Sequence, residues 1–404
     1  MRVLILSWEY PPLIEGGLAR HVRKLAENLA AQGVDVDVLA RGREEDAPEE
    51  EVGGVLVHRV REPERPQDLG EFVAWIEHMN SDMLAAGVEV GDRYDFDVVH
   101  GHDWLVASAG DHLAKRFRAP LVVTIHATEY GRHQGWVDKH PQSYIHGVER
   151  WMANRAERLI TCSSYMREHV ADIYGLEESR VNVISNGIDP SELVPVDDLD
   201  ALRARFAAPD ERLVLLVGRL VYEKGFQLAL EALPGLIERV CNVRFIVAGS
   251  GTAEAELREQ ATRLGLDEHG SFLGWIGDDL LHSLYRIADL TVVPSIYEPF
   301  GLVALEAMAS GCPCLVADTG GLREVVPNED VGLRFRSRDP SSLATMAERL
   351  LTDAELRDRL VAEASEHVLT FDWADVARQV AAVYREVTRP AGASASGQRA
   401  ARSG

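Results

Sequence analysis

Short apolar runs alternate along this chain with segments whose apolar residues have helical spacing, and this alternation constrains the fold more than any other feature. The run Met1–Ser7 is followed by an amphipathic helical pattern near Ala19–Gln32 and then by the run Val34–Ala40. Further apolar runs lie at Val98–His100, Leu121–Ile125, Leu159–Cys162 and Val181–Ile184. Such alternation is typical of a parallel sheet with crossover helices, so the sequence predicts an α/β fold.

The alternation lapses once, in a charged stretch from Pro195 to Arg212, and resumes at Leu213–Val217. The second series continues through Val243–Ala248, Ser271–Leu273, Leu290–Val293 and Cys314–Val316. Two series predict two Rossmann-like domains, residues 1–190 and 191–370, hinged near 190–212. A chain of 404 residues, 46% of them apolar, can bury two such cores. We also expect a surface loop at Arg43–Glu51 and a disordered tail over 389–404.

The chain is strongly acidic, with 42 lysines and arginines against 65 aspartates and glutamates and a net charge of −23. That charge disfavours nucleic acid and anionic membranes as partners, so any phosphate site must be a local basic pocket. No uncharged apolar run reaches the length of about 18 residues that a membrane span requires. The start of the chain reads as a buried strand rather than a signal peptide, so we expect a cytoplasmic protein.

No metal site is expected from the cysteines and histidines. The four cysteines are too few and too scattered for a disulfide framework: Cys162, Cys241, Cys312 and Cys314. The stretch around Cys312-Pro-Cys314 reads as a strand that enters a core. His100 and His102 stand beside Asp103, but no further ligands in the sequence complete a metal set.

Two carboxylates in the stretch Glu298–Glu306 carry the first functional signal. Chain-breaking residues there precede a helical pattern from about Leu302 to Ser310. Mostly helical chain places the two carboxylates roughly 10–12 Å apart, at about 1.5 Å per residue. A glycoside hydrolase needs its two carboxyls within about 5–10 Å of each other. The wider spacing suits a sugar at one end and a ribose at the other, and it predicts a nucleotide-sugar site.

A loop with two cations, Gly218–Gly225, follows the first strand of the second domain. In open α/β sheets ligands bind at the carboxyl ends of strands, so Arg219 and Lys224 lie where a phosphate would bind. Arginine offers phosphate oxygens a fork of donors and lysine a compact charge, and together they can neutralise a departing diphosphate without a metal. A solvated loop in which these cations pair with Glu223 is the alternative.

Two glycine-containing turns differ in what they can bind. Gly16-Gly17 follows the first strand, where backbone N–H groups at a helix start can approach an anion, although a simple tight turn uses the same residues. The stretch Ala248–Gly251 has the beginning of a dinucleotide-binding motif, but Glu254 stands where the third glycine belongs. We therefore expect no NAD site.

Polar residues end several strands of the first domain. His126 ends one apolar run, and Asp103 and Asn186 follow two others, so the three are expected to converge on one crevice. A lone histidine at a strand end is more often a structural hydrogen-bonding group, which is the alternative for each of them. Tyr130 and Trp136 can either stack on sugar rings or belong to the core.

Taken together, these residues resemble a retaining glycosyltransferase of the GT-B fold, family GT4, on its glycogen-synthase-like side. The shared motifs cover nearly the whole chain: Ser7–Pro12 with Gly16-Gly17, His100–Trp104, Thr124–His126, Asn186–Asp189, Gly218-Arg219 with Lys224-Gly225, Pro294-Ser295 with Glu298–Leu302, Glu306-Ala307 and Gly320-Gly321. Trp8–Pro12 and His126–Arg132 are most similar to actinobacterial α-1,4-glucosyltransferases that elongate glucans. The resemblance implies two Rossmann-like domains that face each other across a deep cleft, with the last helix, 371–388, packed back on the first domain.

The resemblance also implies roles for single residues. The diphosphate of the donor is held by Arg219, Lys224 and the N–H of Gly17, and its ribose by Glu306. The transferred sugar is held and oriented by Glu298, Phe300, Gly301, Asn186 and His126, whereas the acceptor side has Asp103, Tyr130 and Trp136. Catalysis depends on Glu298, Arg219, Lys224 and His126, with no metal or other cofactor.

One position departs from the family pattern. Glycogen synthases carry a lysine two residues before the second glycine of the first loop, and here that residue is Glu15. A carboxylate cannot pair with phosphate, so either Arg219 and Lys224 suffice or the loop sits differently.

These implications predict a hexosyltransferase that moves glucose from ADP- or UDP-glucose to the non-reducing end of an α-1,4-glucan, with retained anomeric configuration. The alternative acceptors are a small sugar, a sugar phosphate or a lipid-linked sugar. A nucleotide-sugar 2-epimerase is an alternative with the same architecture. We expect no nucleic acid and no integral membrane association, and a homo-oligomer is left open.

Overall fold

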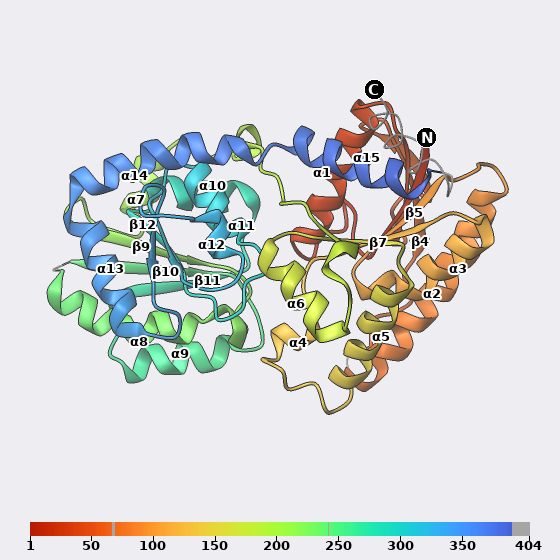
Figure 1. Ribbon diagram of the computed structural model, residues 1–404. Coiled ribbons are helices and arrows are strands. Elements are labelled where there is room, and N and C mark those ends of the chain that lie inside the picture. Colours follow the sequence, from red (N-terminus) through yellow and green to blue (C-terminus); the bar gives the residue numbers. More distant parts are fainter. Residues whose placement is uncertain (67–68, 241, 390–404) are drawn as a thin grey trace, which may run out of the picture.

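The protein consists of two α/β lobes that lie side by side, each with a sheet between layers of helices (Figure 1). This computed structural model describes residues 1–66, 69–240 and 242–389. The two sheets confirm the predicted α/β fold with two parallel-sheet domains. Apart from Arg389, the predicted disordered tail lies outside the described residues, as does Cys241.

The sheet of the first lobe has eight strands in the order β3-β4-β2-β1-β5-β6-β7-β8. All neighbouring strands are parallel except β3 and β4. The strands are β1 (Arg2–Ser7), β2 (Asp35–Gly42), β3 (Glu49–Val52), β4 (Val55–Arg61), β5 (Val98–His102), β6 (Leu121–Ile125), β7 (Arg158–Thr161) and β8 (Val181–Val183).

The edge of this sheet corrects one prediction. The sequence predicts a surface loop at Arg43–Glu51, and residues 43–48 do form turns, but Glu49–Val52 forms β3, which pairs antiparallel with β4. The acidic side chains of β3 are mostly exposed, so the strand carries no apolar signature. Main-chain pairing with a neighbouring strand decides its conformation, and a sequence pattern does not reveal that pairing.

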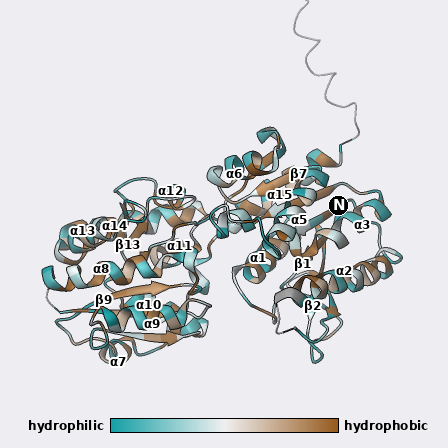
Figure 2. Cartoon of the chain, turned by 90° about the horizontal axis from the view of Figure 1, so that it is seen from below, coloured by the Kyte–Doolittle hydropathy of each residue, from teal (hydrophilic) through white to brown (hydrophobic). Residues whose placement is uncertain are grey.

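Helices cover both faces of the first sheet, and in Figure 2 the helices are coloured in a mixture of hydrophilic and hydrophobic residues while the strands between them are mostly hydrophobic. In α1 the residues Ala19, Val22, Leu25, Ala26 and Leu29 are buried, which is the spacing of one helical face. The helices are α1 (Gly17–Ala31), α2 (Leu69–Gly91), α3 (Ala107–Phe117), α4 (Glu129–Arg132), α5 (Gln142–Arg155) and α6 (Ser164–Tyr174), with short 3₁₀ turns at Trp104–Val106 and Glu178–Arg180.

The sheet of the second lobe has six parallel strands in the order β11-β10-β9-β12-β13-β14. The strands are β9 (Arg212–Val217), β10 (Val243–Ala248), β11 (Gly270–Gly274), β12 (Leu290–Val293), β13 (Cys314–Ala317) and β14 (Leu333–Phe335). The helices of this lobe are α7 (Leu199–Ala204), α8 (Phe226–Arg239), α9 (Glu254–Arg263), α10 (Asp278–Ile287), α11 (Leu302–Ala309), α12 (Leu322–Val325), α13 (Pro340–Thr352) and α14 (Ala354–His367), and 3₁₀ turns lie at Pro190–Glu192, Tyr222–Lys224 and Val368–Thr370.

The chain passes between the lobes twice, because its last helix, α15 (Trp373–Val387), returns to the first lobe and lies against α1 (Figure 1). Gln32 Nε2 donates to the carbonyl of Ala374 at 2.9 Å. The Tyr384 hydroxyl lies 2.7 Å from His100 Nδ1 in a buried contact. The C-terminal segment therefore belongs to the core of the first lobe.

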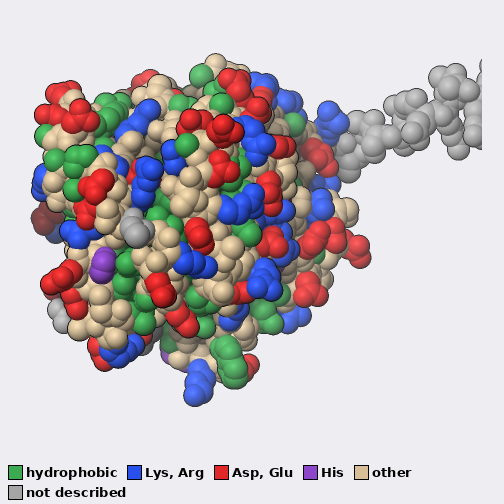
Figure 3. Space-filling model, turned by 90° about the vertical axis from the view of Figure 1, so that its left-hand side faces the viewer, with side chains coloured by type: hydrophobic (Ala, Val, Ile, Leu, Met, Phe, Trp, Pro, Cys, Tyr) green, Lys and Arg blue, Asp and Glu red, His purple; other side chains and the backbone are tan. Residues whose placement is uncertain are grey.

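The outer end of the second lobe, seen in Figure 3, carries acidic and basic side chains intermixed. Opposite charges alternate there without a large patch of one sign. Among the described residues, no helix combines the length and the apolar character needed to cross a membrane.

Candidate active site

A cleft of about 880 Å³ lies where the carboxyl ends of the strands of both lobes meet. In open α/β sheets this is the edge at which ligands bind. Nine of the residues expected at the donor site line this cleft, from both lobes: Gly17, His126, Asn186, Arg219, Lys224, Glu298, Phe300, Gly301 and Glu306.

Lys224 and Glu298 form an ion pair in the cleft. Lys224 Nζ lies 2.7 Å from Glu298 Oε2, which also accepts a hydrogen bond from Ser295 Oγ at 2.9 Å. Glycine is required beside Lys224, because Gly225 has a φ of +73° and a Cβ there would lie 1.9 Å from the carbonyl oxygen of Pro294. This close approach brings the cation loop against the strand end that carries Glu298.

Arg219 lies on the same loop and faces the cleft. Its partner Glu223 is 3.9 Å away, too far for a hydrogen bond. The pKa of Arg219 is lowered, first because the cleft walls exclude water and then because the Arg132 cation is nearby. Arg219 and Arg132 both present positive charge to the cleft, and two such charges attract an anion. The two arginines therefore favour a ligand that carries phosphate.

The glycine turn before α1 is held by a buried carboxylate. Glu9 Oε2 accepts the backbone N–H groups of Glu15 at 2.7 Å and Gly16 at 2.9 Å. Burial raises the pKa of Glu9, and these hydrogen bonds oppose that shift. Because those two amides are already satisfied, the N–H of Gly17, the first residue of α1, is the donor that the turn leaves for an anion in the cleft.

The structure also accounts for the departure at Glu15. Its Oε1 lies 2.7 Å from Arg41 Nη2 and 2.9 Å from Arg65 Nη1. Arg41 is completely buried and is held in addition by Glu62 at 2.6 Å and by the Trp8 carbonyl at 3.2 Å. Glu15 is thus neutralised by arginines of its own lobe instead of presenting a free negative charge to a phosphate.

Glu306 lies in the middle of the helix that the sequence predicts at Leu302–Ser310, and α11 confirms that helix. Its Oε2 accepts a hydrogen bond from the Tyr285 hydroxyl at 2.9 Å. Burial raises the pKa of Glu306, and the Tyr285 hydrogen bond opposes the shift. Glu306 borders both the main cleft and a smaller cavity of about 300 Å³ behind α1.

The three polar strand ends of the first lobe converge only in part. His126 and Asn186 line the cleft, whereas Asp103 does not. Asp103 Oδ1 accepts the backbone N–H of His126 at 2.8 Å, and Asp103 has a φ of +60°. Burial raises the pKa of Asp103 to about 6. Asp103 therefore fixes the backbone that carries His126 and does not face the cleft itself.

The two aromatic candidates also lie outside the cleft lining. Trp136 stands between α4 and α5 with 79% of its surface exposed, so its interpretation as a core residue is wrong. Tyr130 is partly exposed and lies beside the rings of His146 and His169. Both remain accessible to a ligand on the first lobe.

Sequence reasoning missed several residues of the cleft, among them His21, Arg132 and Trp275. The pKa of Arg132 is raised, because Asp103 and Glu149 outweigh the opposing effect of burial. Arg132 is the last residue of the motif that begins at His126. Its positive charge within that motif could have identified it as a cleft residue. His21 lies on a predicted helix whose apolar pattern conceals it.

Histidines gather beside the cleft as well. His21, His102 and His126 have ring nitrogens within 4.8 Å of one another. The sequence predicts that no ligands complete a set around His102, but the fold supplies two further imidazoles from other elements. These three residues are the group in the described part of the chain that could hold a metal ion.

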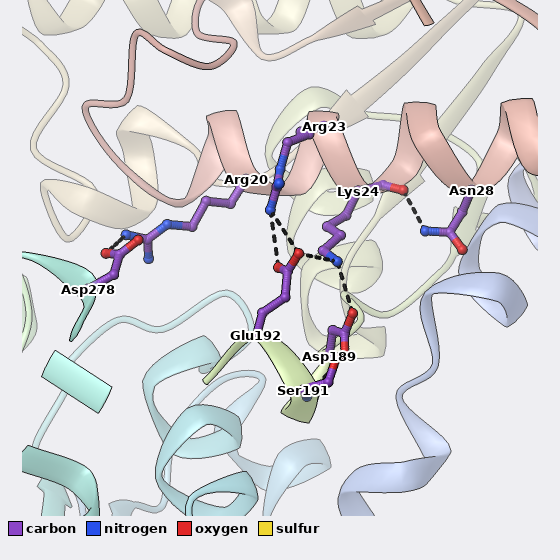
Figure 4. A network of polar contacts seen from close by, with 8 residues as sticks. All are labelled: Arg20, Arg23, Lys24, Asn28, Asp189, Ser191, Glu192 and Asp278. Atoms are coloured by element: carbon purple, nitrogen blue, oxygen red, sulfur yellow. Dashed lines mark hydrogen bonds and ion pairs between the residues drawn. The ribbon is translucent and has the colours of Figure 1, made fainter. Parts of the chain in front are cut away.

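Ionic contacts join α1 to the second lobe and to the connecting segment, as Figure 4 shows. Arg20 pairs with Asp278 at the start of α10. Arg23 lies 3.1 Å from Glu192. Lys24 contacts Asp189 at 2.9 Å and Glu192 at 2.7 Å. The helix that presents Gly17 is therefore anchored to both lobes.

Comparison with known proteins agrees with this architecture. Residues 15–192 match the family model described as Glycosyltransferase Family 4, and residues 199–367 match the one described as Glycosyl transferases group 1. A glycogen synthase of Mycobacterium tuberculosis is 38% identical over 406 residues, covering 96% of this chain and 95% of that protein. A D-inositol 3-phosphate glycosyltransferase of Thermomonospora curvata is 32% identical over 403 residues, covering 95% of this chain and 93% of that protein. The structure of a sucrose-phosphate synthase from Thermosynechococcus elongatus superimposes on this one with a TM-score of 0.82 and 26% sequence identity. The match covers 96% of this chain and 98% of that protein.

Proposed function

The chain belongs to glycosyltransferase family 4, and we propose that it transfers glucose from ADP- or UDP-glucose to the non-reducing end of an α-1,4-glucan, with retention of anomeric configuration. One observation carries this proposal. Two cations of the second lobe, a carboxylate paired to one of them and the start of α1 all border a single cleft large enough for a nucleotide sugar. The similarity to a glycogen synthase supports a glucan as the acceptor.

In the proposed complex the diphosphate lies between the lobes. Arg219 and Lys224 bind its oxygens from one side, and the N–H of Gly17 approaches from the other. Glu306 accepts hydrogen bonds from the ribose hydroxyls, because its carboxylate faces the cleft and has only Tyr285 as a described hydrogen-bond partner.

The transferred sugar lies deeper in the cleft. Glu298 and the backbone at Phe300 and Gly301 hold its hydroxyls, and His126 with Asn186 orients it from the first lobe. Because Lys224 already touches Glu298, one side chain links the sugar-binding carboxylate to the departing phosphate. Departure of the charged diphosphate is thereby coupled, through Lys224 and Glu298, to the position of the sugar.

The reaction needs stabilisation of the leaving diphosphate more than it needs a strong base. The bond between the anomeric carbon and the phosphate oxygen breaks, and the acceptor 4-hydroxyl oxygen attacks from the same face. Its proton passes to the leaving phosphate oxygen, so retention follows without a separate general base. Preorganised cations stabilise the charge that develops on the diphosphate, and in this proposal they take the place of a metal.

The glucan approaches over the first lobe. Trp136 and Tyr130 are exposed aromatic rings on that side and offer faces on which sugars stack. Asp103 acts indirectly, because its carboxylate fixes the backbone of His126.

A sugar phosphate is the second candidate acceptor, and a specific observation favours it. Arg43 and Arg132 of the first lobe line the cleft opposite the donor loop, and either can bind a phosphate on the acceptor. The relatives named above include an enzyme whose name specifies an inositol phosphate acceptor.

The first experiment measures nucleoside diphosphate release from ADP-glucose and UDP-glucose, with and without glycogen, maltohexaose or inositol 3-phosphate. We expect glucan-dependent release with longer oligosaccharides as products. Release that depends on inositol phosphate alone would replace the glucan with a sugar phosphate. Conversion of the donor without any acceptor would indicate hydrolysis or epimerisation and would contradict the transfer reaction.

A further inference from the structure

Three imidazoles gather on the first-lobe side of the cleft and have no common role in the donor site described above. We propose that His21, His102 and His126 bind a zinc ion, and that the bound ion blocks the transfer reaction by engaging His126. The site is formed by three separate elements, namely α1, the end of β5 and the residue after β6. Because β1, β5 and β6 are neighbours in the sheet, their carboxyl ends bring these side chains together.

The distances between the rings are close to those of a zinc site. His102 Nδ1 lies 3.0 Å from His126 Nε2, and the nitrogens of all three residues are within 4.8 Å of one another. Zinc binds imidazole nitrogen at about 2.0–2.1 Å in a tetrahedral arrangement, which places the ligand nitrogens about 3.3–3.4 Å apart. The His21 ring lies 4.6 Å from the His126 ring, centroid to centroid, so a rotation of the His21 side chain brings its nitrogen into range.

A hydrogen-bonded pair of histidines explains the 3.0 Å contact but not the rest of the cluster. Among the described residues, the buried Nδ1 of His21 has no hydrogen-bond partner, although its ring lies against those of His102 and His126. Unsatisfied buried polar atoms are costly, so a ligand that uses this cluster gains free energy. The neutral rings need only exchange tautomers, with each proton on the nitrogen that does not bind the metal, and no net proton is released.

An ion can reach the cluster from the cleft, because His21 and His126 both line it. The three nitrogens leave the fourth zinc position open, as in sites that retain a water. The side chain of Asn186 lies beside His21, and among the described residues its buried Oδ1 has no partner. That oxygen can accept a hydrogen bond from the metal-bound water.

The charges around the cluster set limits on the affinity. The positive charge of Arg132 weakens the binding of a zinc ion at His126. The carboxylate of Asp103, which accepts the backbone N–H of His126, strengthens it. His100 lies beside His102 but is not available as a ligand, because Tyr384 and Thr124 occupy its two nitrogens.

The blocking effect rests on the proposed function, in which His126 orients the transferred sugar. An ion coordinated by His126, with its water directed into the cleft, occupies space that the sugar requires. Zinc and the donor should therefore exclude each other, and a higher donor concentration should lessen the inhibition.

The test is calorimetric titration of the full-length protein with Zn²⁺ in the absence of nucleotide sugar, together with the visible spectrum of the Co²⁺ form. The wild-type protein should bind one ion and give the intense bands of tetrahedral Co²⁺. His21→Ala should weaken Zn²⁺ binding by at least about 100-fold, since loss of a ligand exceeds the loss caused by an outer-shell partner. His282→Ala is the matched control, because His282 is also a buried histidine beside α1 but lies outside the cluster, and it should leave the affinity unchanged.

His21→Gln serves as a second variant that keeps the volume of the side chain, and circular dichroism melting shows that each variant is folded. Unchanged Zn²⁺ affinity in both folded His21 variants, or absence of binding by the wild type, would overturn the site. Binding needs no substrate, so this outcome is independent of whether the transfer reaction is correct. Where transfer is observed, zinc should abolish it and EDTA should restore it; full activity with the site filled would overturn the blocking effect.

Discussion

Lys224 offers the sharpest test of the donor site, because it contacts a carboxylate and faces the cleft at once. Its Nζ lies 2.7 Å from Glu298 Oε2, and the two side chains are 23% and 11% exposed. In Lys224→Ala the Glu298 carboxylate keeps Ser295 Oγ as its described hydrogen-bond donor. The substitution therefore removes a phosphate ligand and leaves a largely buried charge without its counter-ion.

The size of the effect follows from these two losses. A fully buried charge pair that loses one partner costs about 3–5 kcal/mol, and this range applied to the leaving diphosphate in the water-excluded transition state lowers turnover by about two to four orders of magnitude. The effect on folding should be smaller, about 1–3 kcal/mol, because a charged hydrogen bond is lost while the carboxylate keeps some contact with water. Lys224→Arg should recover part of the activity, since it restores the charge but not the compact geometry.

The assay is nucleoside diphosphate release under saturating acceptor, paired with chemical denaturation of each variant. Lys115→Ala is the matched control, because Lys115 pairs with Asp111 at 2.5 Å on α3 and lies outside the cleft lining. It should retain full turnover. A folded Lys224→Ala protein with turnover within about tenfold of wild type would refute the role of Lys224 as a ligand of the leaving group.

Three further predictions concern residues that support the site. Burial raises the pKa of Glu149 to about 8, so the folded protein binds more protons than the unfolded chain between about pH 4.5 and 8, and the free energy of unfolding should fall as pH rises through that range. Glu149→Gln should remove this part of the pH dependence in urea titrations at several pH values, and an unchanged slope would contradict it. Tyr285→Phe deprives Glu306 of its 2.9 Å hydrogen bond and should destabilise the protein by about 1–3 kcal/mol in denaturant titrations, with weaker binding of the donor; equal stability would count against the contact. Gly225→Ala places a Cβ 1.9 Å from the Pro294 carbonyl oxygen and should displace Lys224 from Glu298, lowering both the melting temperature and turnover; wild-type values for both would show that the two segments do not approach so closely.

Much of the candidate site was predictable because its residues stand at the ends of strands. Arg219 follows β9 and His126 follows β6, and the alternating pattern reveals both strands. Parallel strands share one carboxyl edge, so residues far apart in the chain were expected to meet there, and the cleft contains both. The exposed edge strand β3 was missed, because its acidic residues carry no apolar period.

The same logic failed where side-chain direction matters. Asp103 and His126 both follow strands, yet only His126 faces the cleft, because Asp103 turns back to accept the His126 N–H. The partners of Glu15 were equally hidden, since Arg41 and Arg65 are distant in sequence and approach it only after β2 and the following segment have packed.

The sequence by itself determined the two α/β series, the breaks before α1 and α11 and the placement of cations and carboxylates after particular strands. Local periodicity and chain-breaking residues encode these features, and they act over a few residues. Only the tertiary structure decided that Lys224 pairs with Glu298, that Glu9 occupies two amides of the glycine turn and that three histidines meet beside the cleft. Such contacts join segments from different strands or lobes, and their geometry depends on how strand ends and helices pack, which no local pattern contains.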